Sequence, residues 1–157
     1  MVDDDAGFVE FLVAAKRATY AAQGDDATVA PLLPDSKQLE FREGAYLYRD
    51  IYVGMFRFVG QEVVYRADRA LWSMSYAGGL APGVERADAR RVYAFVRSAL
   101  LTATSGLPVR GPAELREGAL TYRCVTHGTL ERFHGDETID EAGRILFELR
   151  FAGGELR

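Results

Sequence analysis

Apolar residues recur at helical spacing in two segments of the chain. The first segment carries Phe8, Phe11, Leu12, Ala15 and Ala18. The second carries Val92, Phe95, Val96, Ala99 and Leu100. Each set falls on one face of an α-helix, and an amphipathic helix of this kind needs an apolar surface to cover. The pattern therefore predicts two helices, each packed by one face on another element.

Elsewhere apolar and polar residues alternate at a spacing of two, which is typical of strands with one buried face. In one strand the apolar positions are Trp72, Met74 and Tyr76, and the polar ones are Ser73 and Ser75. Near the end of the chain the apolar positions are Phe147, Leu149 and Phe151, and the polar ones are Glu148 and Arg150. We expect antiparallel strands that bury one face of a sheet.

The strand segments are two copies of one unit. Residues 42–79 align with residues 116–154, with one inserted residue, and close to half of the aligned positions are identical. Both copies begin with Arg-Glu-Gly-Ala, keep Gly-x-Glu in the middle and end with Ala-Gly-Gly. Because a repeat sets the architecture of a whole domain, we predict one α+β domain over residues 1–157, built of two repeats at approximately 6–79 and 87–154. Each repeat would hold a helix and an antiparallel meander of about three strands, so that two helices pack on a curved antiparallel sheet about a pseudo-twofold axis.

The linker between the first helix and the first copy covers residues 21–41. It is long and carries Pro31 and Pro34. Both features favour an irregular segment.

The composition narrows the classes of function. Hydrophobic residues make up 48% and charged residues 27% of the 157 residues, as in ordinary globular domains. The net charge is −4 and the basic residues are scattered, which argues against binding to the phosphates of nucleic acids. No apolar run is long enough to span a membrane, the start Met-Val-Asp-Asp-Asp is unlike a secretory signal, and Cys124 is the only cysteine. We therefore expect a cytoplasmic protein without a disulfide.

A glutamate interrupts the apolar face of the middle strand in both copies. It is Glu62 in the first copy and Glu137 in the second. An ionised carboxylate is costly to bury alone, and three interpretations follow. A tyrosine hydroxyl or an arginine of the same repeat can satisfy the glutamate inside the core. Gly60 and Gly135 can form bulges that turn it toward solvent, or it can face a cavity and bind a cationic or hydrogen-bonding ligand.

Aromatic residues crowd the first copy, and three tyrosines alternate on one face of a strand, at Tyr46, Tyr48 and Tyr52. The second copy has only Tyr122 on the corresponding face. Most aromatic side chains in a domain belong to its core, so a half-exposed sheet face is an alternative to a pocket. If the face lines a pocket, the candidate ligand-binding residues are Glu62, Glu137, Tyr46, Tyr48, Tyr52, Tyr122, Trp72 and Tyr76.

The sequence contains no motif for catalysis, metal binding or a cofactor. His127 and His134 have no third ligand at a recognisable spacing, so we expect no metal site. Ser73 and Ser75 lack the context of a nucleophile elbow. The glycine pairs that end the copies do not continue into a phosphate-binding loop.

Several blocks of the chain resemble a known family. The blocks are FLVAAKRATYA at 11–21, GAYLYRD at 44–50, FVGQE at 58–62, WSMSYAG at 72–78 and RGP at 110–112. In this order they are similar to an uncharacterised bacterial family of unknown function, found alone or fused C-terminal to XRE-type helix-turn-helix regulators. The resemblance covers nearly the whole chain and implies an accessory or sensory role. It supplies no activity, ligand or catalytic residue.

We interpret the chain as a non-enzymatic module that binds a small molecule in a pocket between the two repeats. One alternative is an enzyme in which a buried glutamate and Tyr48 or Tyr122 form an acid–base pair. A further alternative is an interaction module that forms homodimers through an exposed face or edge of the sheet.

Overall fold

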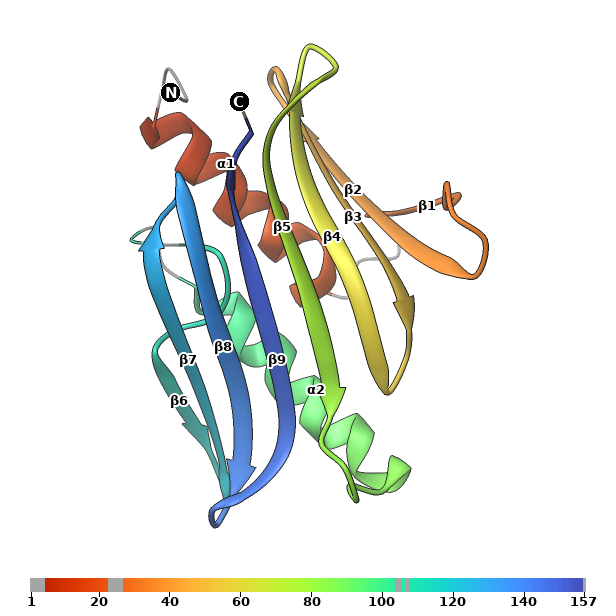
Figure 1. Cartoon of the computed structure of the whole chain (residues 1–157), viewed down its shortest axis with the longest axis vertical. Helices are drawn as coiled ribbons and strands as arrows, with labels where there is room; N and C mark the ends of the chain where they lie inside the picture. The colour runs from red at the N-terminus through yellow and green to blue at the C-terminus, as the bar shows by residue number, and fades with distance from the viewer. Residues whose placement is uncertain (1–4, 23–26, 104–105, 107, 157) are drawn as a thin grey trace.

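The computed structural model of the chain describes residues 5–22, 27–103, 106 and 108–156 (Figure 1). This part of the chain contains the helices α1 (Asp5–Ala18) and α2 (Arg86–Leu101) and one 3-10 turn, η1 (Tyr20–Ala22). Its strands are β1 (Thr28–Val29), β2 (Ser36–Glu43), β3 (Tyr46–Gly54), β4 (Arg57–Arg66), β5 (Arg69–Leu80), β6 (Glu114–Glu117), β7 (Leu120–Thr129), β8 (Arg132–Glu141) and β9 (Arg144–Glu155). No helix among these residues is long and apolar enough to cross a bilayer.

The nine described strands form one antiparallel sheet, in the order β1-β2-β3-β4-β5-β9-β8-β7-β6. Strands β2 to β5 follow one another as neighbours, and so do β6 to β9. The two series meet in the middle of the sheet, where β5 pairs with β9 and Tyr76 lies opposite Phe151. The prediction of an α+β fold with an antiparallel sheet is confirmed.

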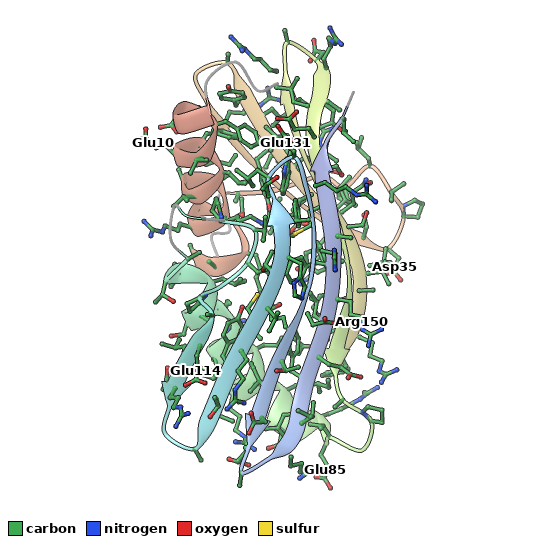
Figure 2. The ribbon with its side chains drawn as sticks, turned by 60° about the vertical axis from the view of Figure 1, so that its left-hand side comes forward. Glu10, Asp35, Glu85, Glu114, Glu131 and Arg150 are labelled. Atoms are coloured by element: carbon green, nitrogen blue, oxygen red, sulfur yellow. The ribbon has the colours of Figure 1, made fainter. Side chains whose placement is uncertain are left out.

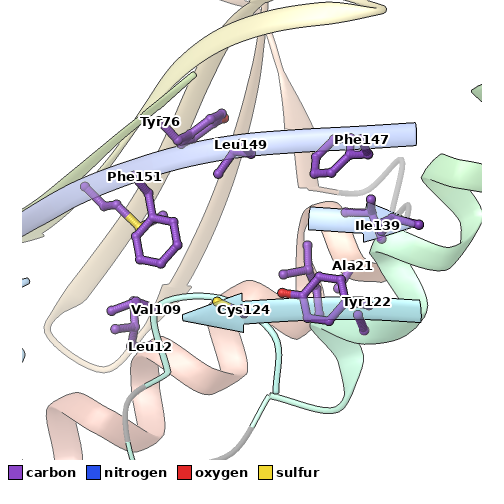
Figure 3. Close-up of a cluster of buried hydrophobic side chains, with 14 of the residues drawn as sticks. Leu12, Ala21, Tyr76, Val109, Tyr122, Cys124, Ile139, Phe147, Leu149 and Phe151 are labelled. Carbon is purple, nitrogen blue, oxygen red and sulfur yellow. The ribbon is translucent and has the colours of Figure 1, made fainter. Parts of the chain in front are cut away.

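Both helices lie on the same side of the sheet (Figures 1 and 2). Phe11 of α1 packs on Tyr46 of β3 with ring centroids 5.0 Å apart. Tyr93 of α2 meets Phe147 of β9 edge-on at 6.0 Å. Between helices and strands lies a core of apolar side chains, part of which Figure 3 shows. Burial of this apolar surface is the main favourable contribution to folding.

The sheet extends further than the sequence pattern predicts. The expectation of an irregular linker over residues 21–41 is wrong for its last part, because β2 begins at Ser36 and pairs along its whole length with β3. Pro31 and Pro34 precede this strand and therefore do not interrupt its hydrogen bonds. With β2 and β6, each series holds four strands, not about three.

The backbone of the middle strands runs straight through Gly60 and Gly135. The register of β4 and of β8 shifts only further along, after Val64 and after Ile139. The interpretation of these glycines as bulges is therefore wrong, and the glutamates two residues later stay on the buried face. A Cβ atom at Gly60 would lie 2.3 Å from the hydroxyl oxygen of Tyr76. Glycine is needed there because an aromatic ring from the neighbouring strand lies across the backbone.

Candidate functional site

A cavity of about 710 Å³ opens between the two helices and strands β3, β4 and β5. This volume is in the range of small-molecule sites. Apolar and aromatic side chains form most of the wall, namely Tyr20, Leu39, Tyr48, Tyr52, Phe56, Phe58, Tyr76, Tyr93, Val96 and Leu100. Buried charged groups also gather in it, and for this reason we take it as the candidate site.

A second hollow, of about 870 Å³, lies over the central strands next to the exposed side chains of Val53 and Val59. Its wall consists largely of glycine, alanine and surface residues of β4, β5 and β9. Its lining holds one aromatic residue, Phe58, and one buried acid, Glu137, whereas the first cavity has several aromatic side chains and two buried acids.

Two carboxyl groups stand side by side at the inner end of the cavity. Asp50 of β3 and Glu62 of β4 are cross-strand partners, only 4% and 3% exposed. Lys16 of α1 forms a buried ion pair with Glu62. Burial lowers the pKa of the Lys16 ammonium group, and the charge of Glu62 opposes that shift. Helix α1 therefore supplies the cation that compensates Glu62.

Asp50 has no such cation. The hydroxyl of Tyr76 donates a hydrogen bond of 2.6 Å to Oδ1 of Asp50. Among the residues that the structure describes, no basic side chain forms an ion pair with Asp50. Burial, and then the neighbouring charge of Glu62, raise the pKa of Asp50 from 3.8 to about 7, against the opposing effects of the Tyr76 hydrogen bond and of the more distant charges of Lys16 and Arg110. Near neutral pH this carboxyl group therefore exchanges its proton inside an aromatic cavity.

A second network surrounds Glu137 of β8. Nε of Arg110 donates to Oε2 of Glu137 at 2.9 Å, and the hydroxyl of Tyr122 donates to Oε1 at 2.6 Å. Burial alone would lower the pKa of the Arg110 guanidinium group, but Glu137, Tyr122 and Glu62 together outweigh it and raise that pKa. Glu137 and Tyr122 are fully buried. Neither Glu137 nor Tyr122 lines the candidate cavity.

Arg110 connects the two networks. Its side chain belongs to the wall of the cavity, and its guanidinium carbon lies 5.9 Å from the centre of the Tyr76 ring. It thus binds Glu137 on one side and contacts the aromatic partner of Asp50 on the other.

The structure brings together some of the residues that the sequence proposed as ligand-binding. Tyr48, Tyr52, Glu62 and Tyr76 line the cavity. Four others are elsewhere. Trp72 is buried in the core and stacks on Phe133 at 5.5 Å. Tyr46 packs on α1, and Tyr122 and Glu137 belong to the second network.

Sequence reasoning missed three charged residues of the site, Lys16, Asp50 and Arg110. For Asp50 a signal was present, because it alternates with Tyr48 and Tyr52 and therefore shares their face. Lys16 and Arg110 come from outside the sheet. The expectation that a tyrosine hydroxyl or an arginine of the same repeat satisfies the glutamate is met for Glu137 by Tyr122 and Arg110. For Glu62 it did not lead to Lys16, and the arginine beside Tyr48, Arg49, binds Glu40 instead.

The histidine, cysteine and acidic side chains of the described residues are not arranged as a metal site. Among the described residues, no three histidine, cysteine, aspartate or glutamate side chains are grouped so as to hold a metal ion. His127 and His134 are cross-strand neighbours with ring centroids 5.2 Å apart, on the exposed face of β7 and β8. Cys124 is buried, and burial raises the pKa of its thiol.

Comparison with known proteins places the chain in a family. Residues 50–156 match the domain of unknown function DUF5680. The chain belongs to the DUF5680 family. No curated protein and no solved structure matches it. The DUF5680 match begins at Asp50 and includes Glu62, Tyr76 and Arg110, whereas Lys16 and Lys37 precede it.

Proposed function

We propose that this chain is a non-enzymatic module that binds a small organic molecule in the cavity between α1, α2 and strands β3 to β5. The single observation that carries the proposal is the carboxyl group of Asp50, which is buried in an aromatic wall and forms no ion pair within the described part of the chain. A buried acid of this kind is usually paired. A ligand that donates hydrogen bonds to Asp50 would supply the missing partner.

We further propose that the chain is one domain of two repeats and that the ligand lies between them. Tyr76 and Phe151 hold the same position in the two aligned segments, and they lie opposite each other where β5 meets β9. A twofold axis between these residues would relate the halves. Helix α2 and Arg110, which line the cavity beside the first meander, belong to the second repeat in this division.

A cavity-filling variant tests the binding function. Ala89 of α2 is buried and lines the cavity, so the side chain of Ala89→Phe would occupy ligand space. Ala87 lies on the exposed side of the same helix, and Ala87→Phe is the matched control. Both proteins are screened by thermal shift against monocyclic and bicyclic aromatic compounds that are neutral, cationic or anionic.

A compound at 100 times its Kd stabilises a folded protein by about 2.7 kcal/mol, which raises Tm by roughly 5–10 °C in a domain of this size. We expect such shifts for the wild type and for Ala87→Phe, and their loss in Ala89→Phe. If no compound shifts the wild type, or if Ala89→Phe responds as the wild type does, the cavity is not a binding site.

One observation favours a second candidate function, an enzyme. A carboxyl group with a pKa of about 7 can act as a general acid or base at neutral pH, and Asp50 has that pKa. Incubation of each stabilising compound with the wild type and with Asp50→Asn, followed by mass spectrometry, separates the two functions. Conversion by the wild type alone would establish an enzyme, and recovery of every compound unchanged supports a binding module.

A further inference from the structure

We infer that the cavity selects an amphipathic organic anion, with one or two aromatic rings, a hydrogen-bond donor at its inner end and an acidic group at the mouth. This inference rests on the proposed binding function and adds the class of ligand.

The open side of the cavity is basic. Lys37 of β2 and Arg90 of α2 line it and are exposed, and among the described residues neither forms an ion pair. Arg97, two turns further along α2, also lines the cavity and donates to the hydroxyl of Tyr20. The formal net charge of the whole chain is −4, so the positive charge at the mouth differs in sign from that of the chain as a whole.

The inner end of the cavity is acidic. Asp50 and Glu62 are the described acidic residues of the wall, and both are buried. Glu62 already has Lys16 as its cation. Asp50 accepts one hydrogen bond, from Tyr76, and a carboxyl group has further acceptor sites. A hydroxyl or N–H group of a ligand can donate to them.

Aromatic side chains line the wall of the cavity between its basic mouth and its acidic inner end. Tyr52, Phe58 and Tyr76 come from three neighbouring strands, and Tyr93 faces them from α2. Phe58 lies 6.0 Å from Tyr76 and 6.2 Å from Tyr93, measured between ring centroids. A flat aromatic body fits such walls because aromatic pairs prefer stacked or edge-on contacts at these separations.

The positive charge of the residues at the mouth of the cavity decides which charge the ligand should carry. A cationic amphiphile would satisfy Asp50, but the basic mouth would repel it during entry. A neutral compound would leave Lys37 and Arg90 without a partner. An acidic group at the mouth is attracted by both Lys37 and Arg90. This attraction weakens as the salt concentration rises, because both side chains are exposed.

Three compounds that share a naphthalene ring system and differ in charge test the inference. They are 6-hydroxy-2-naphthoate, its neutral carboxamide and the cationic 6-(aminomethyl)-2-naphthol, each with a hydroxyl group opposite the variable group. Calorimetric titration at pH 7 and low salt gives their Kd values for the wild type, Lys37→Gln and Arg90→Gln. Arg69→Gln is the control, because Arg69 is exposed, does not line the cavity and carries the same charge.

We expect the naphthoate to bind most tightly and the cation most weakly. Lys37→Gln and Arg90→Gln should each raise the Kd of the naphthoate about two- to fivefold, and leave that of the carboxamide unchanged. Arg69→Gln should change neither. Equal affinity for naphthoate and carboxamide, or tighter binding of the cation, overturns the anion preference while the binding function stands. Failure of all three compounds to bind, together with a negative thermal-shift screen, overturns both.

Discussion

The unpaired carboxyl group of Asp50 should destabilise the protein at high pH, and Asp50→Asn should remove that effect. The pKa of Asp50 is about 7 in the fold, raised by burial and by Glu62 from its ordinary value of 3.8. A group whose pKa is raised on folding binds its proton more tightly in the folded state, so stability falls as pH rises between these two values. At 1.36 kcal/mol for each pH unit, the ionised carboxylate costs the fold about 4 kcal/mol above pH 7.

Asparagine has the shape of aspartic acid and keeps an oxygen that can accept the hydrogen bond of Tyr76. We therefore expect Asp50→Asn to match the wild type within about 1 kcal/mol at pH 4 and to exceed it by up to about 4 kcal/mol at pH 8. Urea unfolding followed by circular dichroism at pH 4, 5, 6, 7 and 8 measures the difference in free energy of unfolding.

Asp136→Asn is the control, since this carboxylate is exposed and pairs with Arg150 at the surface. It should change stability by less than about 1 kcal/mol at every pH. A difference between Asp50→Asn and wild type that is the same at pH 5 and pH 8 would refute the account, because it would show that Asp50 ionises in the fold as it does in the unfolded chain.

Three further substitutions address the networks around the cavity, each measured by urea unfolding at pH 7. Lys16→Met leaves the carboxylate of Glu62 buried without its cation and should cost about 3–5 kcal/mol; addition of Glu62→Gln to this variant should recover part of the loss, and no recovery would contradict the pairing. Arg110→Met removes the cation of Glu137 and should cost a similar 3–5 kcal/mol or so. Gly60→Ala places a methyl group 2.3 Å from the hydroxyl oxygen of Tyr76. It should cost about 1–3 kcal/mol by overpacking and alter the near-ultraviolet spectrum of the tyrosines, and an unchanged spectrum would show that Tyr76 has not moved.

The spacing of apolar residues was sufficient to predict the two helices and the buried faces of the strands. The helical spacing around Phe11 and Val96 predicted two helices, and the alternation at Trp72 and Phe147 predicted which strand faces are buried. Strand β2 was missed because two prolines just before it resemble the signal of an irregular linker. Those prolines lie before Ser36, where the pairing with β3 begins, so they remove no hydrogen-bond donor from it.

The charged part of the site depended on contacts that no local pattern contains. Lys16 meets Glu62 across 46 residues of sequence, and Arg110 meets Glu137 across 27. Both pairings depend on how a helix or loop packs over the sheet, and a lysine near the end of an amphipathic helix looks in sequence like any solvated charge. The burial of the two glutamates was foreseeable from strand parity, and so was a tyrosine hydroxyl of the same repeat as the partner of Glu137; the pairing of Glu62 with Lys16 was not.

The two aligned segments differ at one position beside the cavity. Asp50 and Cys124 hold this position, and each is the cross-strand partner of a glutamate, Glu62 or Glu137. The thiol of Cys124 carries no charge near neutral pH, because burial raises its pKa. One cation therefore balances one anion around Glu137, and that network can close completely. Around Glu62 the same arrangement holds one carboxyl group more than its single lysine can neutralise. The additional acid makes a closed core costly on that side, and this residue, not the glutamate that both segments share, is therefore the one that we propose a ligand would contact.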